Sequence, residues 1–218
     1  MAPCDDRGMP TFAALERAEL VRALRDAGPD APTLCTGWTA QDLAGHLVAR
    51  ERRPDSGPGI MLPAFAGWTE RIRRGYAARP FAELLHLIET GPPWTSPFAL
   101  PGVDAAVNLG EHFVHCEDVR RAAPGWQPRQ LADGIPDALW SALANRGRML
   151  FRRAPSGLTL ATPDGRNARI STGDADLTLI GDPAELTLYA FGRREHALVE
   201  IEGNATAQQQ LRESRFGV

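Results

Sequence analysis

The sequence contains no lysine, and all 24 of its basic residues are arginine. Against 27 acidic residues this leaves a net charge of -3, so the chain lacks the excess of positive charge that is typical of nucleic-acid-binding proteins. The exclusive use of arginine, together with abundant alanine, glycine and proline, indicates a GC-rich genome and not a nucleic-acid surface. We therefore expect no nucleic-acid partner.

Long apolar stretches are also absent, and cysteine is scarce. No apolar run reaches the roughly 18 residues that span a bilayer, and MAPCDDRGMP at the start has acids and prolines where a secretory signal has a basic end and an apolar stretch. The three cysteines, Cys4, Cys35 and Cys116, are an odd number spread far apart, which suits reduced thiols. We expect a cytoplasmic protein with no membrane partner.

The residues that are present suit a globular chain, with 43% apolar and 23% charged side chains among 218 residues. Two loops rich in proline and glycine are expected at residues 54–67 and 92–103. Apolar residues at helical spacing predict helices over residues 11–28, 40–53, 68–78, 80–91, 104–123 and 136–154.

After Pro155 the apolar residues recur in short runs of the β type instead. Strands are expected at residues 157–162, 168–172, 177–181 and 197–203, and helices at residues 182–194 and 205–214. The sequence therefore predicts an α+β protein of two domains. A helical bundle would occupy residues 1–154, and a small α+β domain residues 155–218.

One predicted helix carries several potential metal ligands in the stretch NLGEHFVHCEDVRRA. At about 100° per residue, four of its polar residues fall within one arc of roughly 80°. They are Asn108, Glu111, His115 and Asp118. Glu111 and His115 are four residues apart, so a helix can present both to one metal ion. The same stripe also fits the solvated face of an amphipathic helix, and the spacing alone leaves both interpretations open.

A third ligand should come from another helix, and His46 lies at the edge of the apolar face of residues 40–53. A lone histidine there also fits a hydrogen-bonded core residue. A rival pair, His112 and Cys116, is likewise four residues apart, but it projects from a different face and no further cluster completes a closed zinc site. We interpret Cys116 as a small buried thiol, and His112 as a residue that supports a ligand or lies at the surface.

Three segments in this order resemble the mycothiol-dependent maleylpyruvate isomerase family. They are PTLCTGWTAQDLAGHLVARE, EHFVHCEDVRR and GDPAELTLYAFGRR, and the likeness extends from about Phe12 to the end of the chain. The resemblance implies an N-terminal four-helix bundle of the DinB-like type that binds a metal through His46, Glu111 and His115. Within that family the sequence is similar to an actinobacterial branch of metal-binding proteins.

The resemblance also implies a chemistry. Two imidazoles and one carboxylate leave a divalent metal with open positions, as in catalytic sites. Mycothiol, bound there as the thiolate, would be a nucleophile for isomerisation of a small electrophilic substrate or for S-transfer to it. Zinc is the first choice of metal, although nickel, iron and manganese also suit these ligands. We expect a monomer or a homodimer whose partners are a small thiol and a small electrophile.

Further residues are candidates for supporting roles. Arg193 and Arg194 are available to bind a substrate carboxylate, although basic residues near the C-terminal end of a helix have a simpler explanation. Asn108 and Asp118 are candidates for orienting His115 through its second ring nitrogen. The alternative function is a non-catalytic protein that holds a metal or a thiol as a sensor, carrier or structural site. Solvent access at the three ligands discriminates between the two functions.

Overall fold

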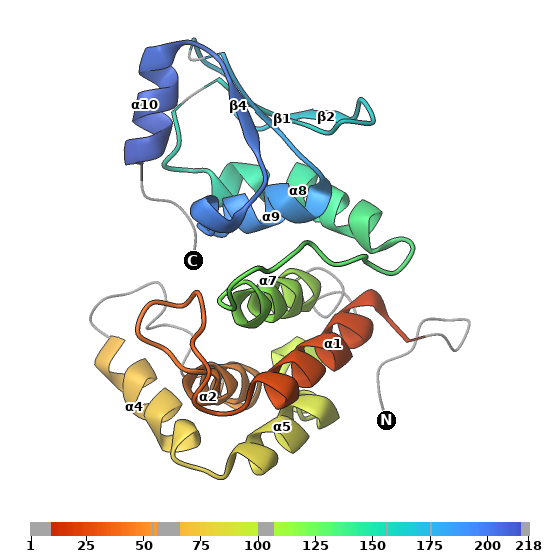
Figure 1. Cartoon of the computed structure of the whole chain (residues 1–218), viewed down its shortest axis with the longest axis vertical. Coiled ribbons are helices and arrows are strands. Elements are labelled where there is room, and N and C mark those ends of the chain that lie inside the picture. The colour runs from red at the N-terminus through yellow and green to blue at the C-terminus, as the bar shows by residue number, and fades with distance from the viewer. Residues whose placement is uncertain are drawn as a thin grey trace. The chain divides into compact units, whose positions relative to one another are not determined.

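The structure, a computed structural model, describes residues 10–53, 55, 66–99, 107–155, 157–174 and 176–214. The chain forms two compact units, residues 1–129 and 130–218. The expected α+β class is confirmed, because the first unit is helical and the second combines helices with a four-stranded sheet (Figure 1). Cys4, most of the predicted loop at residues 54–67 and the start of the predicted helix at Asp104 lie outside the described residues.

The N-terminal unit is built on four helices that share one apolar core. They are α1 (Phe12–Ala27), α2 (Ala40–Arg52), α5 (Phe81–Thr90) and α7 (Leu109–Arg120). A further helix, α4 (Ala66–Ala77), packs along α2, and a short 3-10 turn, η3 (Pro97–Ala99), lies between α5 and α7 in the chain. The helical bundle predicted for the N-terminal part is therefore present.

Local sequence signals set the ends of α1 and α2. The hydroxyl of Thr11 accepts a hydrogen bond from the Ala14 N–H at 3.2 Å, and Gly28, at a φ of 82°, ends α1. Thr39 and Asp42 form a capping box, in which each side chain accepts a hydrogen bond from the backbone N–H of the other. Helix α2 thus begins where its N-cap signal predicts.

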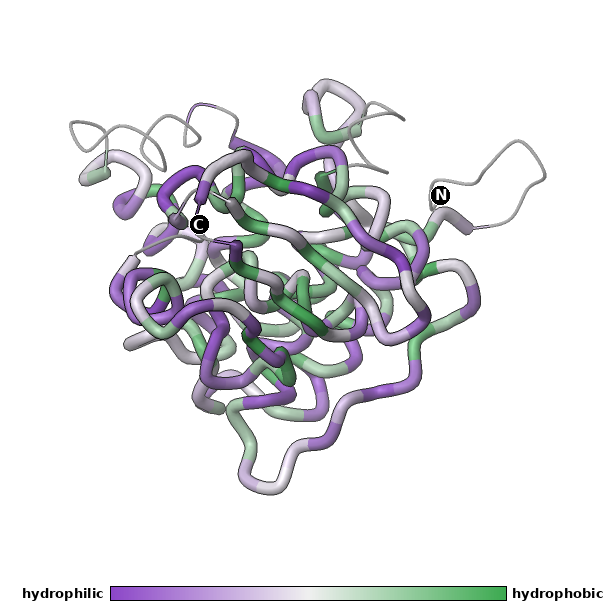
Figure 2. Tube along the Cα trace, turned by 90° about the horizontal axis from the view of Figure 1, so that it is seen from above, coloured by the Kyte–Doolittle hydropathy of each residue, from purple (hydrophilic) through white to green (hydrophobic). Residues whose placement is uncertain are grey.

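The amphipathic character expected of the helices is visible in their packing. On α1, Leu20 and Leu24 are fully buried, whereas Arg22 and Arg25 are exposed. Figure 2 shows the same change between hydrophobic and hydrophilic residues along the trace of the chain. Within the described ranges, no helix is both long and apolar enough to cross a membrane.

The C-terminal unit begins with a helix and continues into a mixed sheet. Its elements are α8 (Ile135–Leu150), β1 (Leu158–Ala161), β2 (Asn167–Arg169), β3 (Leu177–Ile180), α9 (Pro183–Ala190), η5 (Arg194–His196), β4 (Glu200–Glu202) and α10 (Ala205–Glu213). The strand order is β2-β1-β3-β4, with β1 parallel to β3 and the two outer pairs antiparallel. Leucines of β1 and β3 alternate inward and share a core with α8, α9 and α10.

The division between the units falls after residue 129, whereas the sequence analysis divides the chain after residue 154. Helix α8 accounts for the difference, because its Leu143 and Leu150 pack in the core of the sheet, and α8 lies beside α9 (Figure 1). The change of periodicity after Pro155 marks the change from helix to strand, and it carries no information about which core a helix joins. As a statement about domains, the boundary at residue 154 stays a prediction.

Candidate functional site

Helix α7 presents the predicted polar stripe to the interior of the N-terminal unit. Asn108 and Asp118 are fully buried, and His115 is 8% exposed. The Glu111 side chain is 19% exposed. The interpretation of this stripe as the solvated face of an amphipathic helix is therefore wrong, because these polar residues are largely buried. Buried polar groups need hydrogen-bond partners inside the protein.

Helix α2 brings His46 to the same place. The Nε2 atom of His46 lies 3.5 Å from Glu111 Oε1, and the Nε2 atom of His115 lies 3.2 Å from the same oxygen. The two imidazole rings meet edge to face, with centroids 5.3 Å apart. Each of the three residues has one ligand atom within 4.8 Å of those of the other two. The three predicted ligands thus converge on one point between α2 and α7.

The spacing of these atoms fits a divalent metal. In a tetrahedral zinc site with bonds of about 2.0–2.1 Å, neighbouring ligand atoms are about 3.3 Å apart. The two distances to Glu111 Oε1, 3.2 and 3.5 Å, bracket that value. The side chains of His46 and Glu111 are 20% and 19% exposed, so both residues are partly accessible to solvent. Two imidazoles and a carboxylate in this arrangement would leave a metal with positions for an external ligand.

Asp118 holds His115 from the opposite side of the ring. The Nδ1 atom of His115 lies 2.8 Å from Asp118 Oδ2, and the Cys35 thiol donates a hydrogen bond to the same oxygen at 3.3 Å. A proton on Nδ1 directed at a carboxylate leaves Nε2 facing Glu111, which is the tautomer a metal requires. Cys35, His115 and Asp118 are also close enough to form a second group of potential metal ligands.

Arg50 is a site residue that the sequence analysis missed. Its Nε lies 3.4 Å from Glu111 Oε1, its Nη1 donates to Asn108 Oδ1 at 2.9 Å, and its guanidinium stacks on the ring of Phe98 at 4.2 Å. Asn108 also donates to the Phe98 carbonyl at 3.1 Å. Asn108 thus orients Arg50 and, through it, Glu111. Arg50 follows His46 by one helical turn, and that spacing is the only sequence signal that could have found it.

The segment before α2 forms another wall of the site. The ring of Trp38 lies 5.3 Å from that of His46, and Arg73 of α4 stacks on Trp38 at 4.8 Å. The Leu34 N–H donates to the Asp118 carbonyl at 3.0 Å, which ties this segment to α7. Cys35 and Trp38 reach the site through this tertiary contact, so no helical spacing could have predicted them.

The electrostatics of the three predicted ligands differ. Burial raises the pKa of Glu111, but the hydrogen bonds with His115 and His46 and the charge of Arg50 outweigh it and hold the pKa well below its usual range. Burial lowers the pKa of His46, and the positive charges of His115 and Arg50 add to that effect, which the hydrogen bond with Glu111 only partly offsets. Glu111 is therefore an anion at neutral pH, and His46 is a neutral donor.

His115 titrates in the opposite direction. Burial lowers its pKa, but hydrogen bonds with Asp118, Cys35 and Glu111 outweigh burial and raise the pKa well above its ordinary value. The raised pKa favours the form of His115 with protons on both nitrogens, and a metal bound at Nε2 would displace the proton there. Metal binding at this site would release that proton, as is general for protonated ligands.

The rival ligand pair is used in the core instead. Both nitrogens of His112 face acceptors, the Ala13 carbonyl at 3.1 Å and Glu51 Oε1 at 3.2 Å, and the residue is fully buried rather than at the surface. Cys116 is fully buried, and burial raises the pKa of its thiol to about 12. Within the described residues, neither belongs to a group that could hold a metal.

The predicted substrate arginines lie in the C-terminal unit. Arg194 donates from its guanidinium to the carbonyls of Leu211, Arg212 and Ser214 at the end of α10, and Arg193 donates to the Phe191 carbonyl. Arg194 therefore caps the C-terminus of α10, which is a structural use of this residue.

Comparison with known proteins supports the resemblance seen in the sequence. Residues 13–93 match the family described as the mycothiol maleylpyruvate isomerase N-terminal domain. This match includes His46 of α2, and it ends before Glu111 and His115 of α7. No curated protein matches the chain.

Two solved structures share the fold over most of the chain. A crystal structure of the mycothiol-dependent maleylpyruvate isomerase has a TM-score of 0.52 and 16% sequence identity, over 89% of this chain and 92% of that one. The crystal structure of a histidine-to-alanine mutant of that isomerase gives a TM-score of 0.51 with the same identity and coverage. At this identity the likeness establishes the fold and leaves the activity to the site.

Proposed function

We propose that this protein binds one divalent metal ion through His46, Glu111 and His115 and uses it to bind a low-molecular-weight thiol. The observation that supports this most strongly is the convergence of one ligand atom from each residue within 4.8 Å, on side chains that solvent reaches. A donor set sealed by neighbouring side chains would favour a structural or storage site, whereas partial exposure favours an enzyme.

Zinc is the first choice of metal, because it accepts nitrogen and oxygen ligands and does no redox chemistry of its own. When bound, it would stabilise a thiolate far more than a thiol and so supply a nucleophile at neutral pH. The residues of the chain prepare the site for this. His46 offers a neutral nitrogen, Glu111 a negative charge, and Asp118 holds His115 in its ligand orientation.

The thiol that fits the resemblance is mycothiol, and the reaction we assign is isomerisation of a small electrophilic substrate or S-transfer to it. The match of residues 13–93 to the N-terminal domain of the isomerase supports the thiol, and the solved structure with the same fold carries the same cofactor dependence in its name. We also propose Arg193 and Arg194 as candidates for binding a carboxylate of the substrate.

The test is to load the purified protein with Co²⁺ and titrate it with mycothiol. Sulfur entering the metal's coordination shell produces an intense near-ultraviolet charge-transfer band, and a non-sulfur analogue of mycothiol should produce none. A metal-loaded protein that binds no thiol at millimolar concentration would support the sensor, carrier or structural alternative instead. A protein that binds no metal would remove the proposal altogether.

A further inference from the structure

A second polar cluster lies inside the N-terminal unit, and its residues on α2 and α7 directly follow Arg50 and Glu111 of the candidate metal site. It consists of Arg17 of α1, Glu51 of α2 and His112 of α7, which are 4%, 1% and 0% exposed. Glu51 Oε1 lies 3.0 Å from Arg17 Nη2 and 3.2 Å from His112 Nε2. His112 Nδ1 lies 3.1 Å from the carbonyl oxygen of Ala13. Three helices therefore meet at one buried carboxylate.

Stability alone does not explain this cluster. Burying charged groups costs free energy, and the contacts that offset this cost are incomplete here. Glu51 Oε2 and Arg17 Nε have no hydrogen-bond partner among the described residues. Well-packed apolar side chains of similar volume often give equal or greater stability than such a cluster. In some proteins directional polar contacts of this kind fix the register between helices, in addition to what apolar packing provides.

The cluster connects the two helices that carry the predicted ligands. Neighbouring residues of α2 pair with neighbouring residues of α7: Arg50 Nε lies 3.4 Å from Glu111 Oε1, and Glu51 Oε1 lies 3.2 Å from His112 Nε2. Consecutive residues of a helix point about 100° apart, so the two pairs together define both the height and the rotation of α2 against α7. His46 lies one turn before Arg50 on α2, so its position depends on both the height and the rotation of α2.

Arg17 holds the Glu51 carboxylate through an ion pair from α1. A Cβ added at Gly91, which follows α5, would lie 2.4 Å from Arg17 Nη1, so the guanidinium extends directly over this glycine. Gly91 leaves room for the arginine, and the arginine supplies the positive charge that keeps the Glu51 carboxylate in place. The cluster therefore connects the register of α2 and α7 to α1 and to the end of α5.

We propose that Arg17, Glu51 and His112 are positioning residues for the candidate metal site. Sliding α2 along α7 by one residue moves His46 by about 1.5 Å, whereas metal–ligand distances tolerate about 0.2 Å. The contact between Glu51 and His112 keeps His46 Nε2 at the distance from Glu111 and His115 that a metal requires. The inference rests on the proposed function, because it takes those three residues as the ligands.

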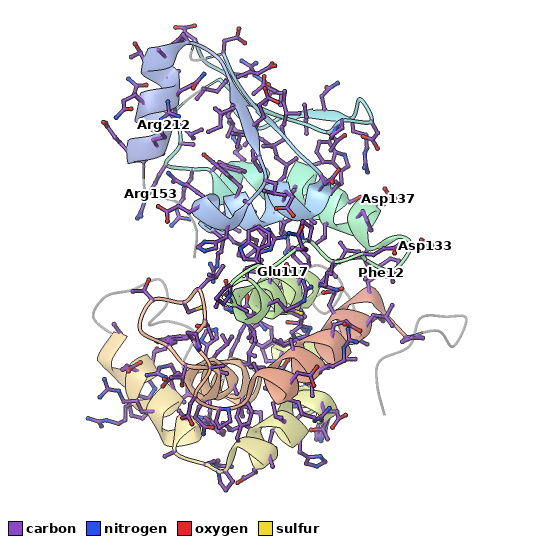
Figure 3. All side chains as sticks on the ribbon, viewed as in Figure 1. Phe12, Glu117, Asp133, Asp137, Arg153 and Arg212 are labelled. Atoms are coloured by element: carbon purple, nitrogen blue, oxygen red, sulfur yellow. The ribbon has the colours of Figure 1, made fainter. Side chains whose placement is uncertain are left out.

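The experiment compares Glu51→Gln with Glu16→Gln. Glu16, on α1, is also a buried carboxylate, and it forms an ion pair with Arg129, which in turn binds Glu117. Glu117 lies on α7, as Figure 3 shows. None of these contacts of Glu16 and Arg129 involves α2, so Glu16→Gln is a matched control for the loss of a buried charge. For each variant, Zn²⁺ affinity is measured by chelator competition, the visible spectrum of bound Co²⁺ reports ligand geometry, and thermal unfolding reports stability.

We expect Glu51→Gln to alter the Co²⁺ spectrum and to weaken Zn²⁺ binding, by no more than the about 10- to 100-fold that follows loss of a residue in direct contact with a metal ligand. Glu16→Gln should lower the melting temperature and leave both metal readouts unchanged. Wild-type Zn²⁺ affinity in Glu51→Gln, or an equal loss in Glu16→Gln, would overturn the positioning role. A wild-type protein that binds no Zn²⁺ would overturn the proposed function itself.

A second variant keeps the test decisive if Glu51→Gln does not fold. Replacing Arg17 by Met, Glu51 by Leu and His112 by Phe together removes every charge of the cluster and fills its volume with apolar atoms, which is often neutral or stabilising. We expect this triple variant to fold, to bind Zn²⁺ more weakly than the wild type and to show the altered Co²⁺ spectrum. Unchanged Zn²⁺ affinity and an unchanged spectrum in the folded triple variant would contradict the proposal.

Discussion

At the scale of single residues, His115 has the most connected position in the site. Its ring lies between Glu111 and Asp118, and its Nε2 and Nδ1 atoms are 3.2 and 2.8 Å from their carboxylate oxygens. We expect His115→Ala to remove most of the bound metal, because two protein ligands remain of three. Metal analysis of the purified variant measures this. His86→Ala, which changes an exposed histidine of α5, is the control and should retain the metal. Full retention in His115→Ala would contradict the assignment.

Cys116 tests the rival ligand pair. Because burial raises the pKa of this thiol to about 12, a thiolate is absent at neutral pH and the side chain acts as a small apolar group. Cys116→Ala should keep the metal and lower the free energy of unfolding by about 1 kcal/mol, as for other small truncations in a core. Urea denaturation and metal analysis of the same sample provide both values. Loss of metal in Cys116→Ala would favour a site at His112 and Cys116.

Helical spacing could predict residues within one helix, but it could not predict their partners. The interval between Glu111 and His115 indicated that both could bind one metal ion, and the structure places His46 beside them. Arg50 and Cys35 enter the same site through contacts between segments 58 and 83 residues apart in sequence. Such contacts depend on how the helices pack, which a single sequence does not record.

At the scale of elements, the approach of α4 to α2 depends on Gly45. A Cβ added there would lie 2.8 Å from the backbone nitrogen of Ala77 and 2.9 Å from its Cβ, and backbone cannot yield as a flexible side chain can. Gly45→Ala should therefore lower stability by about 1–3 kcal/mol through overpacking. It should also disturb His46, the next residue. Gly75→Ala on α4 is the control, because an added Cβ there meets nothing within 4 Å.

The two glycine substitutions are expected to act in opposite directions. Alanine is favoured over glycine in a helix interior by about 0.5–1 kcal/mol, so Gly75→Ala should be neutral or stabilising. Urea denaturation of both variants gives the two free energies of unfolding. Equal stability in the two variants would show that α4 and α2 separate without cost, and it would contradict the close packing at Gly45.

Ion pairs within α4 also predict a pH dependence. Hydrogen bonds from Arg73, opposed by burial and assisted by Arg74, lower the pKa of Glu70 from 4.5 to about 2. A carboxyl group whose pKa is lowered by folding stabilises the folded state above its unfolded pKa, and this contribution is lost as the pH falls towards the folded value. Because the Glu70 side chain is 38% exposed, solvent screening reduces the contribution to about 1 kcal/mol.

The measurement is the stability of Glu70→Gln relative to the wild type as a function of pH. We expect the variant to be less stable at pH 7 and the difference to shrink between pH 4.5 and pH 2, where the wild-type carboxyl becomes protonated. Glu83→Gln is a suitable comparison, since Glu83 forms an exposed pair with Arg79 at 3.0 Å within α5 and its preceding turn. A difference that stays constant across this pH range would show that the ion pair of Glu70 contributes nothing.

The elements themselves were largely predictable, because their signals are local. Thr39 and Asp42 mark the start of α2, and Gly28 marks the end of α1. The assignment of α8 to a core was not predictable, since its apolar residues fit a helical bundle and the face of a sheet equally well.

At the scale of the whole molecule, the fold limits the functions to be considered but does not identify the reaction. The similarity to a mycothiol-dependent isomerase at 16% identity establishes the architecture, and one architecture supports many reactions. The question that decides between an enzyme and a metal-binding protein is therefore whether a thiol enters the metal site.

If the thiol binds to the metal, a measurable number of protons is released. A free thiol has a pKa of about 8.5, so it must lose its proton to bind as thiolate near neutral pH. Adding mycothiol to the metal-loaded protein should therefore release close to one proton per site. Calorimetry in two buffers of different ionisation enthalpy counts the protons, and Glu111→Gln, which removes the only anionic protein ligand of the proposed set, should weaken the binding. Thiol binding without proton release would place the thiol away from the metal and contradict the proposed role of the site.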